Sequence, residues 1–206
     1  MAYFTVKRDI APISLGMERK EIKHPRFKHT RAFVDTETRI LGWVTNTTLK
    51  PVTLVLHIQA FEFSTGKKVF SNTEIRELGA NITTELFDLE LPKSTSQPDE
   101  PAIISTSLTT LPKEGLKPEV IARCTNWPQP YRYLDMPKPS LDVRIDGDTI
   151  LVKTNDVPVK GLAFYAEEVD EVKFEDNLID LVPGDEQVIM ARGLNGRPVD
   201  MRYYGM

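Results

Sequence analysis

The sequence predicts an all-β protein made of two β-sandwich domains. Three observations support this prediction. Short runs in which apolar and polar residues alternate recur along the chain, and a period of two is typical of strands with one buried face. Turn dipeptides separate these runs at short intervals. A segment with four prolines, residues 126–139, then divides the chain into a longer first part and a shorter second part.

The first domain, residues 13–128, is expected to hold seven strands. The clearest is residues 52–61, where every second residue from Val52 to Ala60 is apolar and the side chains between them are largely polar. The other strands are expected over residues 13–17, 39–45, 69–76, 83–91, 103–108 and 120–125. Turns are expected at Asn46-Thr47-Thr48 and at residues 64–67, and the polar residues 94–101 are expected to form a surface loop.

The second domain, residues 140–206, is expected to be a smaller sandwich of about six strands. Residues 141–145 alternate between apolar and charged, and Asp146-Gly147 predicts a hairpin because Asp followed by Gly suits turn residues with positive φ. The return strand, residues 149–153, leaves Leu151 on the second face. Further strands are expected over residues 157–165, with Gly161 as a bulge, and over residues 169–174, 178–181 and 187–191, with a turn at Pro183-Gly184.

Residues 129–139 are expected to connect the two domains. Pro130, Pro137 and Pro139 lie within this segment, and Pro128 comes just before it. Because proline lacks the backbone donor that a central strand requires, the segment should be a stiff, extended connector.

Several segments resemble the C-terminal region of the β-mannosidases of glycoside hydrolase family 2, and the resemblance covers nearly the whole chain. They are the opening Ala2-Tyr3-Phe4-Thr5-Val6-Lys7-Arg8 with Ala11-Pro12-Ile13, the run Pro130-Tyr131-Arg132-Tyr133-Leu134, and Phe174-Glu175-Asp176-Asn177 followed by Asp180-Leu181 and Pro183-Gly184. In that family a TIM barrel that carries the active site is followed by immunoglobulin-like sandwich domains. The resemblance therefore implies that both sandwiches are immunoglobulin-like.

The resemblance also implies that residues 1–12 hold a short helix left from an upstream catalytic barrel. The pattern of residues 3–10 alone is compatible with a helix or a strand. Met1 then stands where the barrel helix should already be under way. If the chain is a fragment, Tyr3, Phe4 and Val6 should lie on an exposed apolar face that has lost its contact.

The implied function is that of a non-catalytic C-terminal scaffold in a β-mannosidase, an enzyme that removes terminal non-reducing β-D-mannose with retention. Its partner would be the upstream TIM-barrel domain, which binds the manno-oligosaccharide and carries both catalytic glutamates. No catalytic residue is expected in this chain, and the acidic residues between Glu167 and Asp176 are expected to face water. The alternative is a free-standing carbohydrate-binding or adhesion module, because fold does not determine function.

Composition argues against several other classes of protein. The net charge is −4 with 40% hydrophobic residues, which disfavours disorder and a nucleic-acid partner, and the basic segment 19–31 is interrupted by apolar and acidic residues. The chain contains no run of eighteen apolar residues, so no membrane partner is expected. His24 and His29 are a poor ligand set, so neither a metal nor a cofactor is expected. Cys124, the single cysteine, is expected to be a buried, inert thiol.

Exposed aromatic side chains are the remaining candidates for a binding role. Trp127, Tyr131 and Tyr133 cluster near the connector and are candidates for stacking on a sugar ring. The competing interpretation is that they clamp the two sandwiches together and that Trp43 belongs to the core. We assign no substrate-binding residue from the sequence.

Two sequons, at Asn46 and Asn81, would accept glycans only if the protein entered the secretory route. The single cysteine and the lack of a signal-peptide profile at the start favour an intracellular location over secretion.

Overall fold

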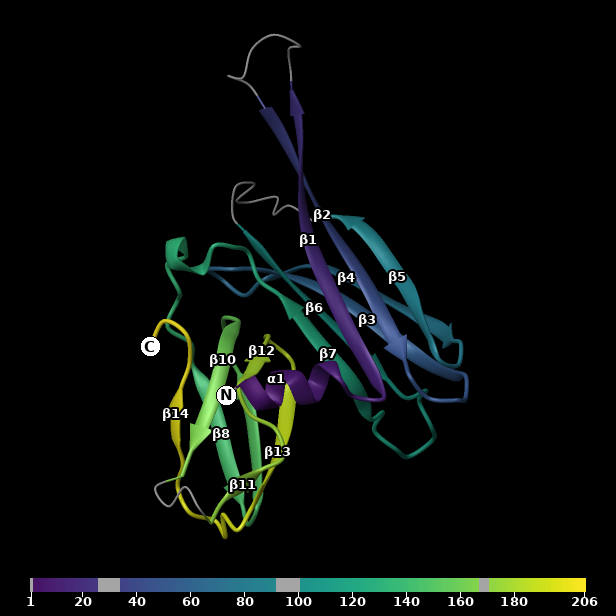
Figure 1. Cartoon of the computed structure of the whole chain (residues 1–206). Coiled ribbons are helices and arrows are strands. Elements are labelled where there is room, and N and C mark those ends of the chain that lie inside the picture. Colours follow the sequence, from purple (N-terminus) through teal and green to yellow (C-terminus); the bar gives the residue numbers. More distant parts are fainter. Residues whose placement is uncertain (1, 26–33, 92–100, 167–170) are drawn as a thin grey trace. The chain divides into compact units, whose positions relative to one another are not determined.

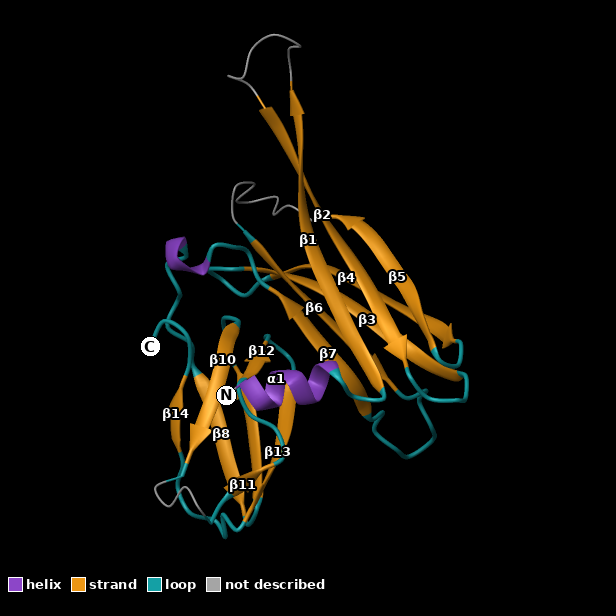
Figure 2. Cartoon of the chain, viewed as in Figure 1, coloured by secondary structure: helices purple, strands orange, loops and turns teal. Residues whose placement is uncertain are grey.

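The computed structural model describes residues 2–25, 34–91, 101–166 and 171–206. Strands dominate this part of the chain, and α1 (Ala2–Asp9) is a single short α-helix at the start (Figure 2). The chain divides into two compact units. One unit is Arg8–Ala60 with Val69–Pro128, and the other is Met1–Lys7, Phe61–Lys68 and Gln129–Met206. We call the β-sandwiches built by β1 to β7 and by β8 to β14 the first and the second sandwich.

The first sandwich has two sheets (Figure 1). One has the strand order β1-β2-β5 and the other the order β4-β3-β6-β7. The strands are β1 (Ile13–Pro25), β2 (Val34–Asn46), β3 (Val52–Glu62), β4 (Lys68–Leu78), β5 (Ile82–Glu90), β6 (Ala102–Thr109) and β7 (Val120–Asn126).

The second sandwich also has two sheets, with the orders β12-β10-β14 and β11-β13-β9-β8. Its strands are β8 (Leu141–Asp146), β9 (Thr149–Thr154), β10 (Val159–Tyr165), β11 (Lys173–Phe174), β12 (Ile179–Leu181), β13 (Glu186–Arg192) and β14 (Asp200–Arg202). The predicted fold class, an all-β chain with two immunoglobulin-like sandwiches and a short helix at the start, is therefore confirmed.

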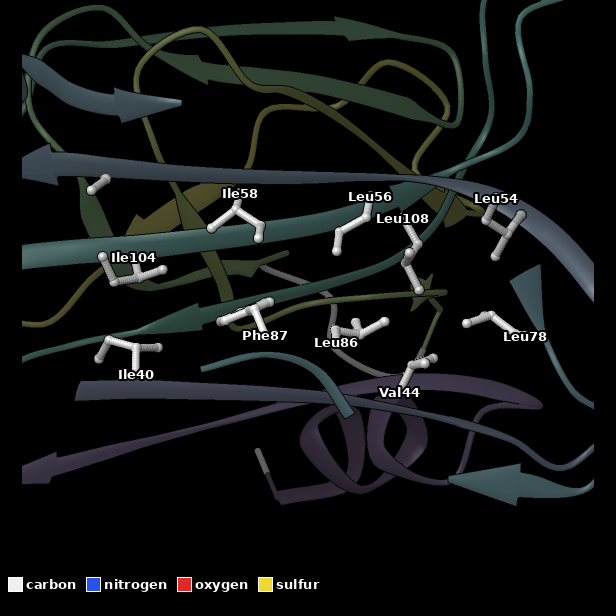
Figure 3. Close-up of a cluster of buried hydrophobic side chains, with 11 residues drawn as sticks. Ile40, Val44, Leu54, Leu56, Ile58, Leu78, Leu86, Phe87, Ile104 and Leu108 are labelled. Atoms are coloured by element: carbon white, nitrogen blue, oxygen red, sulfur yellow. The ribbon is translucent and has the colours of Figure 1, made fainter. Parts of the chain in front are cut away.

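Each sandwich has its own apolar core, built from every second residue of its strands. In the first core, Leu54, Leu56 and Ile58 of β3 lie opposite Ile40 and Val44 of β2 (Figure 3). The second core gathers Ile150, Val152, Leu162, Phe164, Leu181 and Ile189, all of which are almost completely buried. Because burying one such side chain contributes about 1.5–3 kcal/mol, these clusters supply most of the stability of each sandwich.

The assignment of Trp43 to the core is wrong, because its side chain is 36% exposed. In β2 the even-numbered residues Ile40 and Val44 point into the core, so the period of two places Trp43 on the outer face. Between them lies Gly42, and the ring of Phe87 occupies the space that a Cβ at position 42 would need. A change of register between β2 and β5 at Gly42 and Trp43 marks a bulge there.

Most predicted strands of the first sandwich are confirmed, but the first two are longer than expected. The predicted strand 13–17 continues to Pro25, and the predicted strand 39–45 begins at Val34. The two pair residue by residue from Ile13 opposite Asn46 to Pro25 opposite Val34. Two strands can pair through their backbone hydrogen bonds without a buried face along their whole length. The outer half of this ribbon therefore does not need apolar residues at every second position, and the sequence shows no such alternation there.

The second sandwich differs from the prediction in three places. The hairpin turn consists of Gly147 and Asp148, one residue later than expected, and Asp146 still pairs with Thr149. Gly147 has a φ of 56°, which fits a tight hairpin with glycine at its first central position. The strand predicted over 169–174 is only Lys173–Phe174 among the described residues, and β14 was not expected. The bulge at Gly161 is confirmed by a φ of 62° and a register shift.

The helix at the start and the connector differ in how well they match the expectations. The predicted helix is confirmed as α1, in which no residue is buried and Tyr3 and Val6 are 67% and 52% exposed, while Phe4 is half-buried. The segment 129–139 is not extended throughout, since Tyr131–Tyr133 form a turn of 3₁₀-helix.

No helix in the described ranges is long and apolar enough to cross a membrane. The predicted loop 94–101 falls, except for Pro101, outside the described residues.

Candidate functional site

The described residues contain no buried pair of carboxylates of the kind that serves a retaining glycosidase, and the two acids that share Arg39, Glu37 and Asp88, are partly exposed and ion-paired. Such an enzyme holds two carboxyl groups about 5 to 5.5 Å apart. Six polar or charged side chains are buried in the described part of the chain, and Glu62 is the single acid among them. Its carboxylate accepts a hydrogen bond from the Thr65 hydroxyl at 2.5 Å, within the turn that joins β3 to β4. Glu62 therefore has a structural contact and no buried carboxylate beside it.

In the acidic run of the second sandwich Glu171 and Glu175 face solvent, whereas Asp176 is half-buried and accepts a hydrogen bond from the N–H of Asn177. Glu175 pairs with Arg192 at 2.5 Å, and Glu171 lies 3.7 Å from Arg197, with 45% and 69% of the two acidic side chains exposed. Glu167, Glu168 and Asp170 lie outside the described residues. Exposed ion pairs of this kind contribute little to stability and are not arranged for acid–base chemistry.

Hydrogen bonds stabilise the ionised form of two other carboxyl groups. The Arg144 guanidinium donates to Asp142 at 2.9 Å and lowers the pKa of that carboxyl, with a smaller contribution from Lys153. Backbone N–H groups of Asn195 and Gly193 donate to Asp148 and lower its pKa as well. A catalytic general acid needs a raised pKa, so neither group suits that role.

His57 is the one described histidine with a defined hydrogen-bonding environment. Its Nδ1 lies 3.2 Å from the Thr73 hydroxyl and its Nε2 lies 3.1 Å from the Thr109 hydroxyl, across the sheet β4-β3-β6. Desolvation by burial lowers the pKa of the imidazole. The hydroxyls are compatible with a neutral ring, because a hydroxyl can either donate or accept.

We expect His57 to make the stability of the first sandwich depend on pH. The folded state has the lower pKa, so the stabilisation is complete above the unfolded value of about 6.5 and is lost as the pH falls through that value towards the folded pKa. Urea unfolding at pH 7 and pH 5 should show a larger loss of stability for the wild type than for His57→Gln. Equal losses in the two proteins would show that His57 does not contribute.

Metal binding finds no support in the described ranges, which contain no group of three or more His, Cys, Asp or Glu side chains placed to hold an ion. Cys124 is half-buried in β7, opposite Thr106 of β6. The expectation of a buried thiol is therefore wrong, because Cys124 is only half-buried, and its inertness stays a prediction.

The aromatic candidates near the connector separate into three different environments. Trp127 is only 2% exposed, so its indole offers no face to a sugar. Tyr131 is half-buried, with Lys160 Nζ 4.5 Å from its ring centroid and Tyr204 in an edge contact at 5.9 Å. Tyr133 is 70% exposed. They do not form one aromatic platform, and the interpretation that they clamp the two sandwiches stays a prediction.

An apolar pocket of about 220 Å³ lies in the unit that contains the second sandwich. It is lined by Phe4 of α1 and, among others, by Phe164, Val172 and Phe174. Its polar member Asn177 already bonds the backbone of Phe164 through both its amide nitrogen and its amide oxygen. A sugar requires several polar partners, so this pocket is poorly suited to one.

The two sequons differ in exposure. Asn46 is 1% exposed, and its amide makes three hydrogen bonds to Thr48 and Lys50 in the turn that follows β2 and a fourth to the carbonyl of Gly79, between β4 and β5. Asn81 is exposed in a turn, with a φ of 49°. In the folded protein, therefore, only the second asparagine presents its amide to solvent.

The residues that carried the resemblance in the second sandwich have structural roles. The side-chain amide of Asn177 accepts a hydrogen bond from the backbone N–H of Phe164 in β10 and donates one to its carbonyl. The Asp180 carboxylate accepts a hydrogen bond from the backbone N–H of Gly161, the bulge residue, at 2.8 Å. Pro183 and Gly184 form the turn before β13, where the N–H of Asp185 donates to the carbonyl of Val182. The motif therefore fixes the irregular parts of the sandwich and supplies no reactive group.

Comparison with known proteins finds β-mannosidases among the similar proteins. Residues 38–133 match the family model of the Mannosidase Ig/CBM-like domain. The whole chain is similar to β-mannosidase B of Thermothelomyces thermophilus, with 37% identity over 211 residues that cover 100% of this chain and 24% of that protein. β-Mannosidase B of Aspergillus niger is 30% identical over 94% of this chain and 22% of its own length. The chain thus spans about a quarter of the length of these curated relatives.

Solved structures share the fold. The crystal structure of a β-D-mannosidase from Dictyoglomus thermophilum matches 98% of this chain and 23% of its own, with a TM-score of 0.68 and 17% identity. An exo-chitosanase of Amycolatopsis orientalis matches 100% of this chain and 27% of its own, with a TM-score of 0.56 and 14% identity. The resemblance that the sequence motifs indicated is confirmed.

Proposed function

We infer, from the membership of residues 38–133 in the Mannosidase Ig/CBM-like domain family, that this chain is a non-catalytic part of a β-mannosidase. The enzyme would hydrolyse terminal non-reducing β-D-mannose residues with retention, and both catalytic carboxylates would belong to a TIM-barrel domain of the same protein. This chain would supply a scaffold for that barrel.

Two findings together support this proposal: the whole chain is similar to part of a β-mannosidase, and its described residues hold no pair of buried carboxylates. The similarity to β-mannosidase B runs over all of this chain and covers only 24% of the relative. In the described part of the chain, Glu62 is the single buried acid and contacts Thr65 in a turn. A segment that resembles part of an enzyme, and whose described residues hold no pair of buried carboxylates, is expected to support chemistry that takes place elsewhere in the protein.

A scaffold of this kind affects the rate of hydrolysis because it helps to hold the catalytic groups of the barrel in position. Reacting groups must be held close to their productive geometry, and a displacement of about 1 Å can cost about a hundredfold in rate. Two rigid sandwiches with separate cores are suited to this task, since packed interiors deform little.

A chimaera tests the proposal. The matching quarter of T. thermophilus β-mannosidase B would be replaced by this chain, and cleavage of p-nitrophenyl β-D-mannopyranoside would be measured. We expect a kcat within about tenfold of the parent enzyme, whereas deletion of the same quarter should lower soluble activity by about a hundredfold or more. Full activity after deletion would contradict a supporting role. The first-formed anomer, followed by proton NMR, tests retention separately.

The second candidate is a free-standing carbohydrate-binding module. The exposure of Trp43 on the outer face of its sheet favours it, because exposed aromatic rings are suited to contact with a ligand. The mass of the native protein distinguishes the two candidates: a β-mannosidase would be about four times as long as this chain, whereas a module would have a mass close to 23.4 kDa.

A further inference from the structure

Trp43 lies flat on the outer face of the sheet β1-β2-β5, over Gly16 of β1. The two residues are direct partners in the β1–β2 pairing. A Cβ built on Gly16 would lie 2.4 Å from Cε2, 2.5 Å from Cζ2 and 2.6 Å from Nε1 of Trp43. Cε2 is bonded to both other atoms and is still the nearest, so the glycine lies under the face of the indole and not at its edge. Trp43 is 36% exposed, so Gly16 and its neighbours cover this residue only in part.

Polar side chains that suit hydroxyl groups lie beside Trp43 in the pairing of β2 with β5. Glu85 of β5 is the partner of Trp43 in the β2–β5 pairing and is exposed. None of the hydrogen bonds or ion pairs between described residues involves Glu85, so its carboxylate oxygens are available as acceptors. The hydroxyls of Thr45 and Thr83 lie 2.9 Å apart on the next pair of the same face. Figure 1 shows the three strands side by side, and the register places Gly16, Trp43, Thr45, Thr83 and Glu85 on the same face of their sheet.

This combination is complementary to a pyranose ring. The face of an aromatic ring carries partial negative charge and attracts weakly positive C–H groups. In β-mannose the C1, C3 and C5 hydrogens point to one face of the ring, and the hydroxyls lie around its edge. A carboxylate accepts hydrogen bonds from hydroxyls, and a threonine hydroxyl can donate or accept.

We propose that Trp43, Glu85 and the Thr45–Thr83 pair form a binding surface for a β-linked manno-oligosaccharide. The indole stacks on one mannose ring, Glu85 accepts hydrogen bonds from its hydroxyls, and Gly16 allows the indole to lie flat. The choice of a mannoside rests on the proposed function, whereas the binding of a pyranose rests on the surface itself. Binding is weak, because a single stacked ring with a few hydrogen bonds on an open sheet excludes little water.

Two other roles of Trp43 are possible outcomes of the experiments below. Trp43 could serve only to cover Gly16, an aromatic–glycine pairing that supports sheets without any ligand. The surface could instead be covered by another domain of a longer protein.

Nuclear magnetic resonance on the ¹⁵N-labelled chain tests the proposal, because the protein has two tryptophans and each gives one indole N–H signal. The probe is β-1,4-mannohexaose, titrated well past an expected Kd on the order of 1 mM. The Trp43 signal should shift with saturation, and the signal of the buried Trp127 should not move. Absence of a shift at Trp43, or equal shifts of both signals, would overturn the proposal.

Variants locate the contact. Trp43→Ala should abolish binding, Trp43→Phe should retain part of it, and Glu85→Gln should weaken it about threefold to tenfold because a charged acceptor binds hydroxyls more strongly than an amide. Gly16→Ala should lift the indole and weaken binding too. Tyr133→Ala removes an aromatic side chain that is 70% exposed and lies outside this sheet, so it should change nothing. Thermal unfolding of each variant confirms that it is folded.

Four further results would each contradict a different part of the proposal. Undiminished binding by folded Trp43→Ala would refute the surface. Equal affinity for cello-hexaose would refute the mannoside assignment. If the isolated chain binds and the chimaera with β-mannosidase B does not, another domain covers the surface, which overturns its role in the enzyme. Chimaera activity with no binding by the chain would refute this inference and leave the proposed function standing.

Discussion

Replacing Asn46 with aspartate is expected to destabilise the first sandwich by about 3–5 kcal/mol, the cost typical of an uncompensated buried charge. The Asn46 amide nitrogen donates to the carbonyls of Lys50 and Gly79 at 3.0 and 2.8 Å. Its amide oxygen accepts from the N–H and the hydroxyl of Thr48 at 3.0 and 2.7 Å. Aspartate would place a negatively charged oxygen against two carbonyl oxygens at a site that is 1% exposed.

Thermal or urea unfolding measures this effect, and Asn81→Asp is the matched control. Asn81 belongs to the other sequon and is exposed in a turn, where aspartate also tolerates a positive φ. The control should change the free energy of unfolding by no more than about 0.5 kcal/mol. Similar small effects at both positions would show that the Asn46 network does not organise the turn.

Asn177→Leu is expected to destabilise the second sandwich by a comparable amount, about 3–5 kcal/mol, because each buried polar group left without a partner costs about 1–3 kcal/mol. The Asn177 oxygen accepts from the N–H groups of Phe164 and Leu178 at 2.8 and 2.9 Å, and its nitrogen donates to the Phe164 carbonyl at 2.9 Å. Leucine has a similar size and replaces none of these contacts. The site is 8% exposed, so water cannot readily replace them either.

Hydrogen exchange gives a local measurement for Asn177→Leu. The Phe164 amide should lose protection well beyond the global decrease in stability, since its acceptor is removed. Asp176→Asn is the control, because an amide oxygen can still accept the N–H of Asn177 that Asp176 accepts now at 2.8 Å. Unchanged protection of Phe164 in Asn177→Leu would contradict the assigned role.

Alternation of apolar and polar residues located the strands that have one buried face. It succeeded for β3 and β9, where Ile150 and Val152 are buried and Leu151 lies on the other face as expected. It failed for the outer half of the β1–β2 ribbon, where the two strands pair through their backbones and the sequence shows no apolar alternation. Trp43 was misassigned because large apolar residues occur on both faces of β2, and periodicity alone does not say which face is inside.

The binding candidates could be predicted only in part for a similar reason. Trp127, Tyr131 and Tyr133 were grouped because they are close in sequence, but exposure separates them, from 2% for Trp127 to 70% for Tyr133. The signal for Trp43 was present: a glycine at position 16 of the partner strand leaves room for an indole to lie flat. Recognising it required the register of β1 against β2, which depends on contacts distant in sequence.

The central claim is that this chain supports a β-mannosidase active site without containing one. Its most direct test is the hydrolysis of p-nitrophenyl β-D-mannopyranoside by the purified 206-residue chain, with β-mannosidase B as the positive control. We predict a rate equal to that of the buffer blank. Saturable hydrolysis that follows the chain through purification, and that is lost on substitution of one of its own carboxylates, would contradict the claim.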